Sequence, residues 1–169
     1  MKLKNEKMVY DGWRKVVKKE FIYKDRIFDF EIKKEELSAC ILPITKNGNV
    51  ILAKQFRPGP QKILNELPGG GVEKGENPTD AAERELLEET GFKGKLIQLG
   101  SSWDCGYSTR YRHHFISLDC EKVREPENNP NEPIEVIELP IKDFIDLVHS
   151  GELTDSETAY RGLEYLKLL

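Results

Sequence analysis

The chain has 169 residues, of which 26 are Lys or Arg and 30 are Asp or Glu, so its formal net charge is −4 with histidine neutral. A chain of this length fits one domain of ordinary size. The acidic balance argues against a general nucleic-acid binder, which needs a basic surface for phosphate contacts. No run approaches the roughly 18 apolar residues of a membrane helix, and the first residues contain no apolar signal segment. Membrane and secreted classes are therefore disfavoured.

The cysteines point to a compartment. Cys40, Cys105 and Cys120 are odd in number and have no CxxC spacing. They make neither a disulfide framework nor a zinc site, and they fit a reducing environment. We therefore expect a cytoplasmic protein.

Strands are predicted for most of the chain. The first dozen residues are polar and are expected to be loose, whereas residues 16–33 have the pattern of a hairpin. Apolar segments rich in Ile, Leu and Val follow, and Asn47-Gly48 between the first two of them is a strong hairpin signal. These further strands are predicted over residues 38–45, 50–56, 63–67, 96–103, 113–118 and 134–139.

Two helices are predicted near the C-terminus. Residues 142–150 are amphipathic and stop at Gly151, a typical residue after a helix end. Thr154 is expected to be the N-cap of the last helix, with Glu157 completing a capping box. Because most predicted strands come before or between a few helices, we expect an α+β fold with a mixed or mainly antiparallel sheet.

A third helix follows a glycine-rich loop and carries the chemistry. Asn77 is a good N-cap, Pro78 fits the first helical position and Gly91 ends the run. At about 100° per residue, the carboxylates of Glu85, Glu88 and Glu89 fall on one face of this helix.

Three carboxylates on one stripe repel one another. Such a helix face is either simply solvated or neutralised by a bound cation. Arg84 can pair with Glu88 four residues later but cannot neutralise all three charges. A divalent cation can do so. Oxygen ligands without His or Cys select Mg²⁺ or Mn²⁺ over zinc.

Residues 70–92 resemble the signature of the Nudix hydrolase family (MutT-like) at every fixed position. The matching residues are Gly70, Glu76, Arg84, Glu85, Leu86, Glu88, Glu89, Gly91 and Phe92. The resemblance implies a Nudix α/β/α sandwich with a mixed sheet and an N-terminal β-hairpin extension. It also implies metal-dependent hydrolysis of a nucleoside diphosphate linked to another group, since bound metal neutralises developing charge and activates water.

By position, the resemblance makes Glu85, Glu88 and Glu89 metal ligands. The Gly70 carbonyl is implied as a further ligand. Glu76 is implied to accept hydrogen bonds from Arg84 and so to hold the loop and helix together.

The segment before this signature indicates a subfamily. Gln55-Phe56-Arg57 and Asn65-Glu66 before the glycine-rich loop resemble the hydrolases of ADP-ribose and related nucleotide sugars. This resemblance implies that Arg57 contacts phosphate and that Glu66 joins the metal or substrate network. The alternative is that Arg57 and Glu66 only pair with each other.

Residues 1–34 also resemble that subfamily, in which this region forms a homodimer and supplies aromatic side chains that stack on the base. Trp13 and Phe28 are the candidates, with a core or interface role as the alternative for Trp13. The single Nudix domain is then residues 1–169, with residues 35–169 as its core.

The loop after the signature departs from the subfamily because it contains no proline. Tyr107, in Asp104-Cys105-Gly106-Tyr107-Ser108, resembles a tyrosine of diadenosine polyphosphate hydrolases instead. The base that activates water is expected in the loop 125–133, where Glu132 aligns best, unless these acids only solvate the loop.

The sequence therefore predicts an enzyme that hydrolyses the pyrophosphate of a small nucleotide, most simply ADP-ribose or a nucleotide sugar, with no nucleic acid or membrane partner. Diadenosine polyphosphate hydrolysis and a non-catalytic ADP-ribose-sensing module are the alternatives. A sensing module usually has an eroded signature and an attached DNA-binding domain. An isoprenoid diphosphate isomerase of the same fold is disfavoured because it lacks the full signature.

Overall fold

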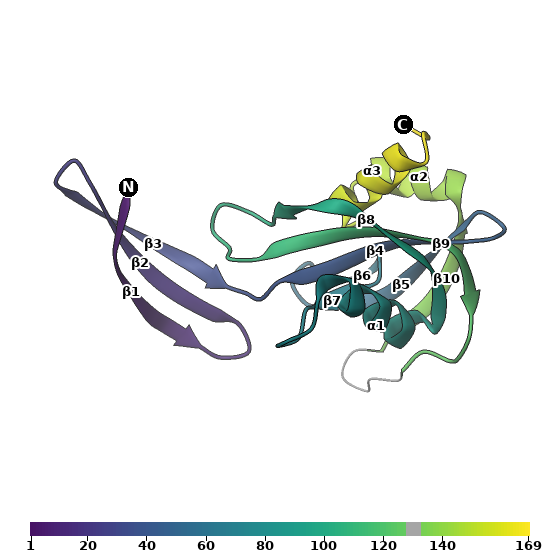
Figure 1. Cartoon of the computed structure of the whole chain (residues 1–169), viewed down its shortest axis with the longest axis horizontal. Helices are drawn as coiled ribbons and strands as arrows, with labels where there is room; N and C mark the ends of the chain where they lie inside the picture. Colours follow the sequence, from purple (N-terminus) through teal and green to yellow (C-terminus); the bar gives the residue numbers. More distant parts are fainter. Residues whose placement is uncertain (128–132) are drawn as a thin grey trace. The chain divides into compact units, whose positions relative to one another are not determined.

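The computed structural model describes residues 1–127 and 133–169, and the chain divides into two compact units. Unit 1 comprises Met1–Leu37 and Ser101–Arg112, and unit 2 comprises Ser38–Gly100 and His113–Leu169. The elements of both units are labelled in Figure 1. The assignment of residues 1–34 and 35–169 as parts of one domain stays a prediction.

Unit 1 is built on a three-stranded antiparallel sheet in the order β1-β2-β3. Its strands are β1 (Lys2–Asp11), β2 (Lys15–Tyr23) and β3 (Arg26–Lys34). The predicted hairpin is β2–β3, and Tyr23 pairs with Arg26 across a two-residue turn. Lys24 and Asp25 in that turn have φ of 46° and 59°, the combination that matches the twist of hairpin strands.

The expectation that the first dozen residues are loose is wrong, because β1 pairs with β2 along its length. Every residue of β1 is exposed, so backbone pairing and not burial of side chains defines this strand. The other part of unit 1, residues 101–112, is hydrogen-bonded to the end of β3. Lys33 N–H donates to the Tyr107 carbonyl at 2.9 Å, and Thr109 N–H donates to the Lys33 carbonyl at 3.0 Å.

Unit 2 is built on a seven-stranded sheet whose main order is β10-β5-β4-β9-β8, with β6 paired to β5 and β7 paired to β4. Its strands are β4 (Ser38–Thr45), β5 (Asn49–Arg57), β6 (Lys62–Glu66), β7 (Gly69–Gly71), β8 (Phe92–Trp103), β9 (Tyr111–Lys122) and β10 (Glu135–Pro140). The ends of β8 and β9 that the loop 104–110 joins belong to unit 1. The predicted Asn47-Gly48 turn is present between β4 and β5, with φ of 79° at Gly48.

The short strand β7 was not predicted, because three glycines have no side-chain pattern. It pairs with the start of β4, so that Gly70 lies opposite Ala39 and Gly69 opposite Cys40. A side chain at Gly69 would collide with the Ala39 carbonyl. Glycine is therefore needed for this close approach, which fixes the loop leading into the next helix.

Helices cover both faces of the sheet: α1 (Pro78–Thr90) on one side, α2 (Ile141–Ser150) and α3 (Ser156–Tyr165) on the other (Figure 1). The two faces have separate cores, as the alternation of β4 shows. Leu42 packs with Phe144 and Leu163 on the α2–α3 side, whereas Ile41 packs on the α1 side. The expected α+β fold and α/β/α layering are thus confirmed.

The helix ends agree with the local signals in two cases and disagree in one. The Asn77 side chain accepts from the N–H groups of Thr79 and Asp80, and Gly91 and Gly151 end α1 and α2 with φ of 77° and 78°. The prediction that Thr154 caps the last helix is wrong. Helix α3 begins at Ser156 with Asp155 at the N-cap position, and no side chain bonds the free N–H groups there.

Among the helices of the described residues, none is long and apolar enough to span a bilayer.

Candidate active site

The candidate site is the junction of β7 with α1, and Arg84 organises it. Its guanidinium donates to both Glu76 oxygens at 3.0 and 3.1 Å and to the Gly71 carbonyl at 2.9 Å. These bonds connect the helix with the two ends of the loop that precedes it, and the structure thus has the Glu76–Arg84 pairing that the resemblance implies. The hydrogen bond from Arg84 lowers the pKa of Glu76, and Glu76 raises the pKa of Arg84.

The same guanidinium also reaches the acidic face of α1. Its Nη1 donates to Glu85 at 2.8 Å and to Glu88 at 3.2 Å. Glu89 turns toward the glycine-rich loop, where its Oε2 accepts from the Gly69 N–H at 2.9 Å. Within residues 1–127 and 133–169, no three His, Cys, Asp or Glu side chains are grouped as ready metal ligands. Arg84 stands between two of the carboxylates, and the third is bonded to the backbone.

The surroundings of Glu85 and Glu89 disfavour the charged form of each carboxylate. Burial raises the pKa of Glu89 to about 8, although the Gly69 N–H and the charge of Arg57 oppose the rise. Burial also raises the pKa of Glu85, against the hydrogen bond and charge of Arg84. The positive charges of Arg84 and Arg57 therefore compensate the ionised carboxylates only in part.

A divalent cation fits this donor set. The Glu85 carboxylate lies so close to the Gly70 backbone that a Cβ at Gly70 would collide with it. The Glu85 carboxylate oxygens therefore lie beside the glycine-rich loop, and carboxylate oxygens are ligands that Mg²⁺ and Mn²⁺ prefer. A bound cation would also favour the charged forms of Glu85 and Glu89.

A second cluster lies at the ends of β5 and β6. Arg57 Nε donates to Glu66 Oε2 at 2.7 Å and Nη2 lies 2.5 Å from the same oxygen, so the pairing that the sequence left open is present. Gln55 Nε2 also donates to that oxygen at 3.0 Å. The other oxygen of Glu66 accepts from the Thr154 hydroxyl at 3.0 Å.

Gln55 and Thr154 were not predicted to join this cluster. A signal existed for Gln55, because alternation along a strand places it on the same side as Arg57. No local signal existed for Thr154, which lies 88 residues from Glu66 in the chain. The Glu66 side chain is only 4% exposed, so it depends on these donors, while Arg57 stays 39% exposed and accessible to an anion.

The aromatic candidates Trp13, Phe28 and Tyr107 all belong to unit 1. Trp13 is 91% exposed and Tyr107 is 60% exposed, whereas Phe28 is half-buried on β3. The Tyr107 ring lies 6.3 Å from the ring of Phe30. The contacts of Trp13 and Phe28 with a nucleotide base, and of Tyr107 with the substrate, stay predictions.

The proposed base Glu132 lies outside the described residues. The chain before it is attached to the C-terminal end of α1. Val123 and Arg124 donate their N–H groups to the Gly91 carbonyl, and Glu127 N–H donates to the Glu88 carbonyl at 2.7 Å. Glu127 therefore lies at the C-terminal end of α1.

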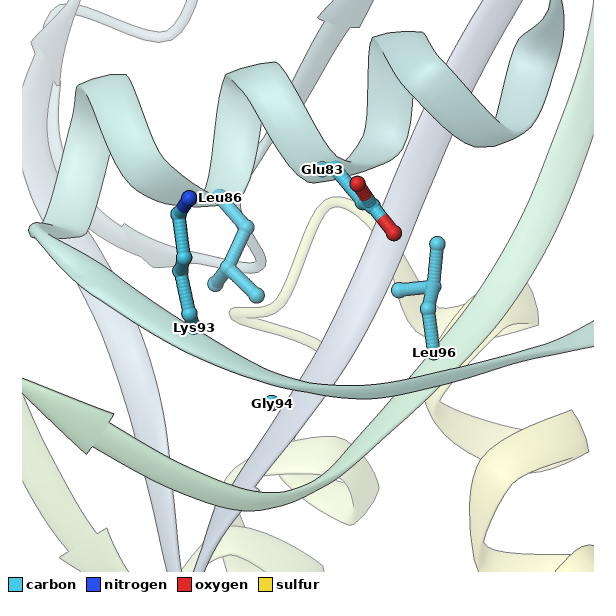
Figure 2. Close-up of a pocket in the computed structure, with 5 residues that line it drawn as sticks. All are labelled: Glu83, Leu86, Lys93, Gly94 and Leu96. Atoms are coloured by element: carbon cyan, nitrogen blue, oxygen red, sulfur yellow. The ribbon is translucent and has the colours of Figure 1, made fainter.

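A small hollow lies elsewhere along α1. Figure 2 shows Glu83 and Leu86 of α1 facing Lys93, Gly94 and Leu96 of β8 around it. Its volume of about 100 Å³ is well below the roughly 300 Å³ of a small-molecule site. It contains none of the candidate site residues, so it is not a candidate nucleotide pocket.

Comparison with known proteins places this geometry in a family. Residues 34–163 match the NUDIX domain. An ADP-ribose pyrophosphatase of Bacillus subtilis is 31% identical over 172 residues, covering 91% of this chain and 92% of the relative. A methanol dehydrogenase activator of Bacillus methanolicus is 24% identical with the same coverage.

A solved structure shares the fold. The crystal structure of an ADP compounds hydrolase superposes with a TM-score of 0.83 and covers 99% of this chain and 95% of the other. At 21% sequence identity, this likeness concerns the fold alone.

Proposed function

Because the chain belongs to the Nudix family, we propose that it hydrolyses the pyrophosphate linkage of ADP-ribose or a similar nucleotide sugar, giving a nucleoside monophosphate and a sugar phosphate. It is a Nudix pyrophosphohydrolase that acts on nucleoside diphosphate derivatives. The observation that carries the proposal is the acidic face of α1, where Glu85 and Glu89 are half-buried against the glycine-rich loop. The Bacillus subtilis relative, named an ADP-ribose pyrophosphatase, supports the choice of substrate.

Nudix hydrolases generally use divalent metal ions, and we propose Mg²⁺, with Mn²⁺ as a substitute. Glu85, Glu88 and Glu89 would hold the metal together with the Gly70 carbonyl. When bound, it supplies charge neutralisation of the pyrophosphate and a water of lowered pKa. Arg84 would hold Glu85 and Glu88 in place, and Glu76 would hold Arg84, as their hydrogen bonds support.

The remaining candidate residues are proposed to bind the substrate or to accept a proton. Arg57 is proposed to bind a substrate phosphate, with its guanidinium held by Glu66. Glu132 is proposed to take a proton from the attacking water. Trp13 and Phe28 remain proposed contacts to the base, and Tyr107 remains a proposed contact to the substrate.

We also propose a homodimer formed through residues 1–34 and a cytoplasmic location. The free thiols of Cys40, Cys105 and Cys120 fit a reducing compartment. Light scattering of the purified protein measures the oligomeric state directly, and a monomer at micromolar concentration would overturn the dimer.

A substrate panel tests the proposed activity. Purified protein is incubated with Mg²⁺ and with ADP-ribose, a nucleotide sugar or a diadenosine polyphosphate, and phosphomonoester products are measured. ADP-ribose or the nucleotide sugar should have the highest kcat/KM. The same panel run with Mn²⁺ tests the metal preference.

Glu89→Gln should abolish turnover, while Glu83→Gln on the exposed side of the same helix should retain it. Preference for the diadenosine substrate would favour the alternative hydrolase. Absence of any product, with ADP-ribose still bound, would favour a sensing module.

A further inference from the structure

The start of α3 departs from the local rule that its sequence suggests. Thr154 and Glu157 have the spacing of a capping box, in which the threonine hydroxyl bonds a free N–H of the first turn. The helix instead begins one residue later, and no side chain caps it. A cap normally stabilises a helix, so its loss indicates that the Thr154 hydroxyl has another role.

That hydroxyl is directed at a buried carboxylate. Thr154 Oγ1 lies 3.0 Å from Glu66 Oε1 and 3.1 Å from Asp155 Oδ2. A hydroxyl has one proton, which it donates to one acceptor at a time. Glu66 has the greater need of it, because its side chain is only 4% exposed whereas Asp155 is half-buried and reaches water.

The two carboxylate oxygens of Glu66 accept hydrogen bonds from different donors. Oε2 accepts from Gln55 and from Arg57, and Oε1 accepts from Thr154. With Oε1 held, the carboxylate plane cannot rotate freely, so the side of the carboxylate that Arg57 contacts is fixed as well. The orientation of the Arg57 guanidinium is therefore coupled to the Thr154 hydroxyl.

The exposed loop that carries Thr154 is anchored in the core by one residue. Helix α2 ends at Gly151, whose φ is 78°. Two residues later Leu153 is only 4% exposed and packs in the core with Phe144 and Leu163. A buried leucine directly before Thr154 restricts the movement of its hydroxyl, as a positioning contact requires.

We propose that Thr154 is a positioning residue which, through Glu66, fixes the Arg57 guanidinium for binding a substrate phosphate. The inference rests on the proposed function, because it assumes that Arg57 meets the phosphate. It adds the α2–α3 loop to the parts of the chain that set substrate affinity. Thr154 touches neither substrate nor metal in this account.

The test uses the full-length protein and two substitutions at Thr154. Thr154→Val removes the hydroxyl at nearly constant shape, and Thr154→Ser keeps it. Thr45→Val is the matched control, because Thr45 accepts a hydrogen bond from Asn49 N–H in the turn after β4 and lies at the far end of that strand from β7. KM and kcat for ADP-ribose with Mg²⁺ are measured, together with AMP binding by calorimetry.

Thr154→Val should raise KM and weaken AMP binding about tenfold, with kcat changed by less than about threefold. Thr154→Ser should restore wild-type values and Thr45→Val should keep them. Should Thr154→Val fail to fold, Thr154→Ala takes its place in the same comparison.

Wild-type KM and AMP affinity in the folded variant that lacks the hydroxyl would overturn the positioning role while leaving the proposed function intact. An equal loss in Thr45→Val would also overturn it, since the effect would then be general. A wild-type protein that releases no product from any substrate of the panel would instead refute the proposed function.

Discussion

Glu89→Gln should change the stability of the metal-free protein in a pH-dependent way. Burial raises the pKa of Glu89 from 4.5 to about 8 in the folded chain. Well below pH 4.5 the carboxyl is protonated in both the folded and the unfolded state, so it does not lower the free energy of unfolding. As the pH rises toward 8, the unfolded chain releases a proton that the folded chain retains, and stability is lost until the folded carboxyl also ionises.

The size of this loss follows from the two pKa values. At about 1.4 kcal/mol for each pKa unit, the difference sets an upper bound of about 5 kcal/mol. Glu89 is only partly shielded from water, so a net cost of about 1–3 kcal/mol is the expected range. Glutamine does not ionise and still offers an oxygen to the Gly69 N–H, so it avoids this cost.

Urea unfolding in EDTA at pH 5, 7 and 9 provides the measurement. The free energy of unfolding of Glu89→Gln should exceed that of wild type by about 1–3 kcal/mol at pH 9, and the difference should fall below about 1 kcal/mol at pH 5. Glu83→Gln, on the exposed side of α1, should show no such trend. A stability difference that stays constant with pH, or a Glu89→Gln protein that is less stable at pH 9, would refute the reasoning.

Other substitutions test separate parts of the structure. Gly70→Ala should lower Mg²⁺ affinity about tenfold by displacing the Glu85 carboxylate, whereas Gly71→Ala has open space and should not; equal affinities in calorimetry would contradict this. Arg84→Lys should lower kcat/KM by about tenfold to a hundredfold, because it loses the planar contacts that hold the loop and carboxylates; wild-type kinetics would contradict this. Phe144→Ala should cost about 3–5 kcal/mol in urea unfolding, because the ring is fully buried; a loss below about 1 kcal/mol would show that the α2–α3 core tolerates a cavity.

The parts of the fold that were predictable have signals within a few residues. Asn77, Pro78 and Gly91 mark the ends of α1, and its helical period alone places three carboxylates on one face. The Asn47-Gly48 turn and the apolar run that forms β4 likewise appear in the sequence before any tertiary contact is known.

The features that were missed depend on partners distant in sequence or on the backbone alone. Strand β1 exposes all its side chains, so no apolar pattern marks it, and β7 consists of glycines. The direction of the Thr154 hydroxyl depends on Glu66, which a capping rule does not consider. The proposed roles of the aromatic candidates of unit 1 and of Glu132 are defined by contacts with a bound nucleotide. These roles stay predictions.

The central claim is that the acidic face of α1 holds a metal for pyrophosphate hydrolysis. Phosphorus NMR of ADP-ribose with purified protein and Mg²⁺ tests it most directly. The account predicts that the two pyrophosphate signals are replaced by two phosphomonoester signals of equal area, with no reaction in EDTA or in Glu89→Gln. Unchanged pyrophosphate signals with either Mg²⁺ or Mn²⁺, or undiminished turnover in Glu89→Gln, would contradict it.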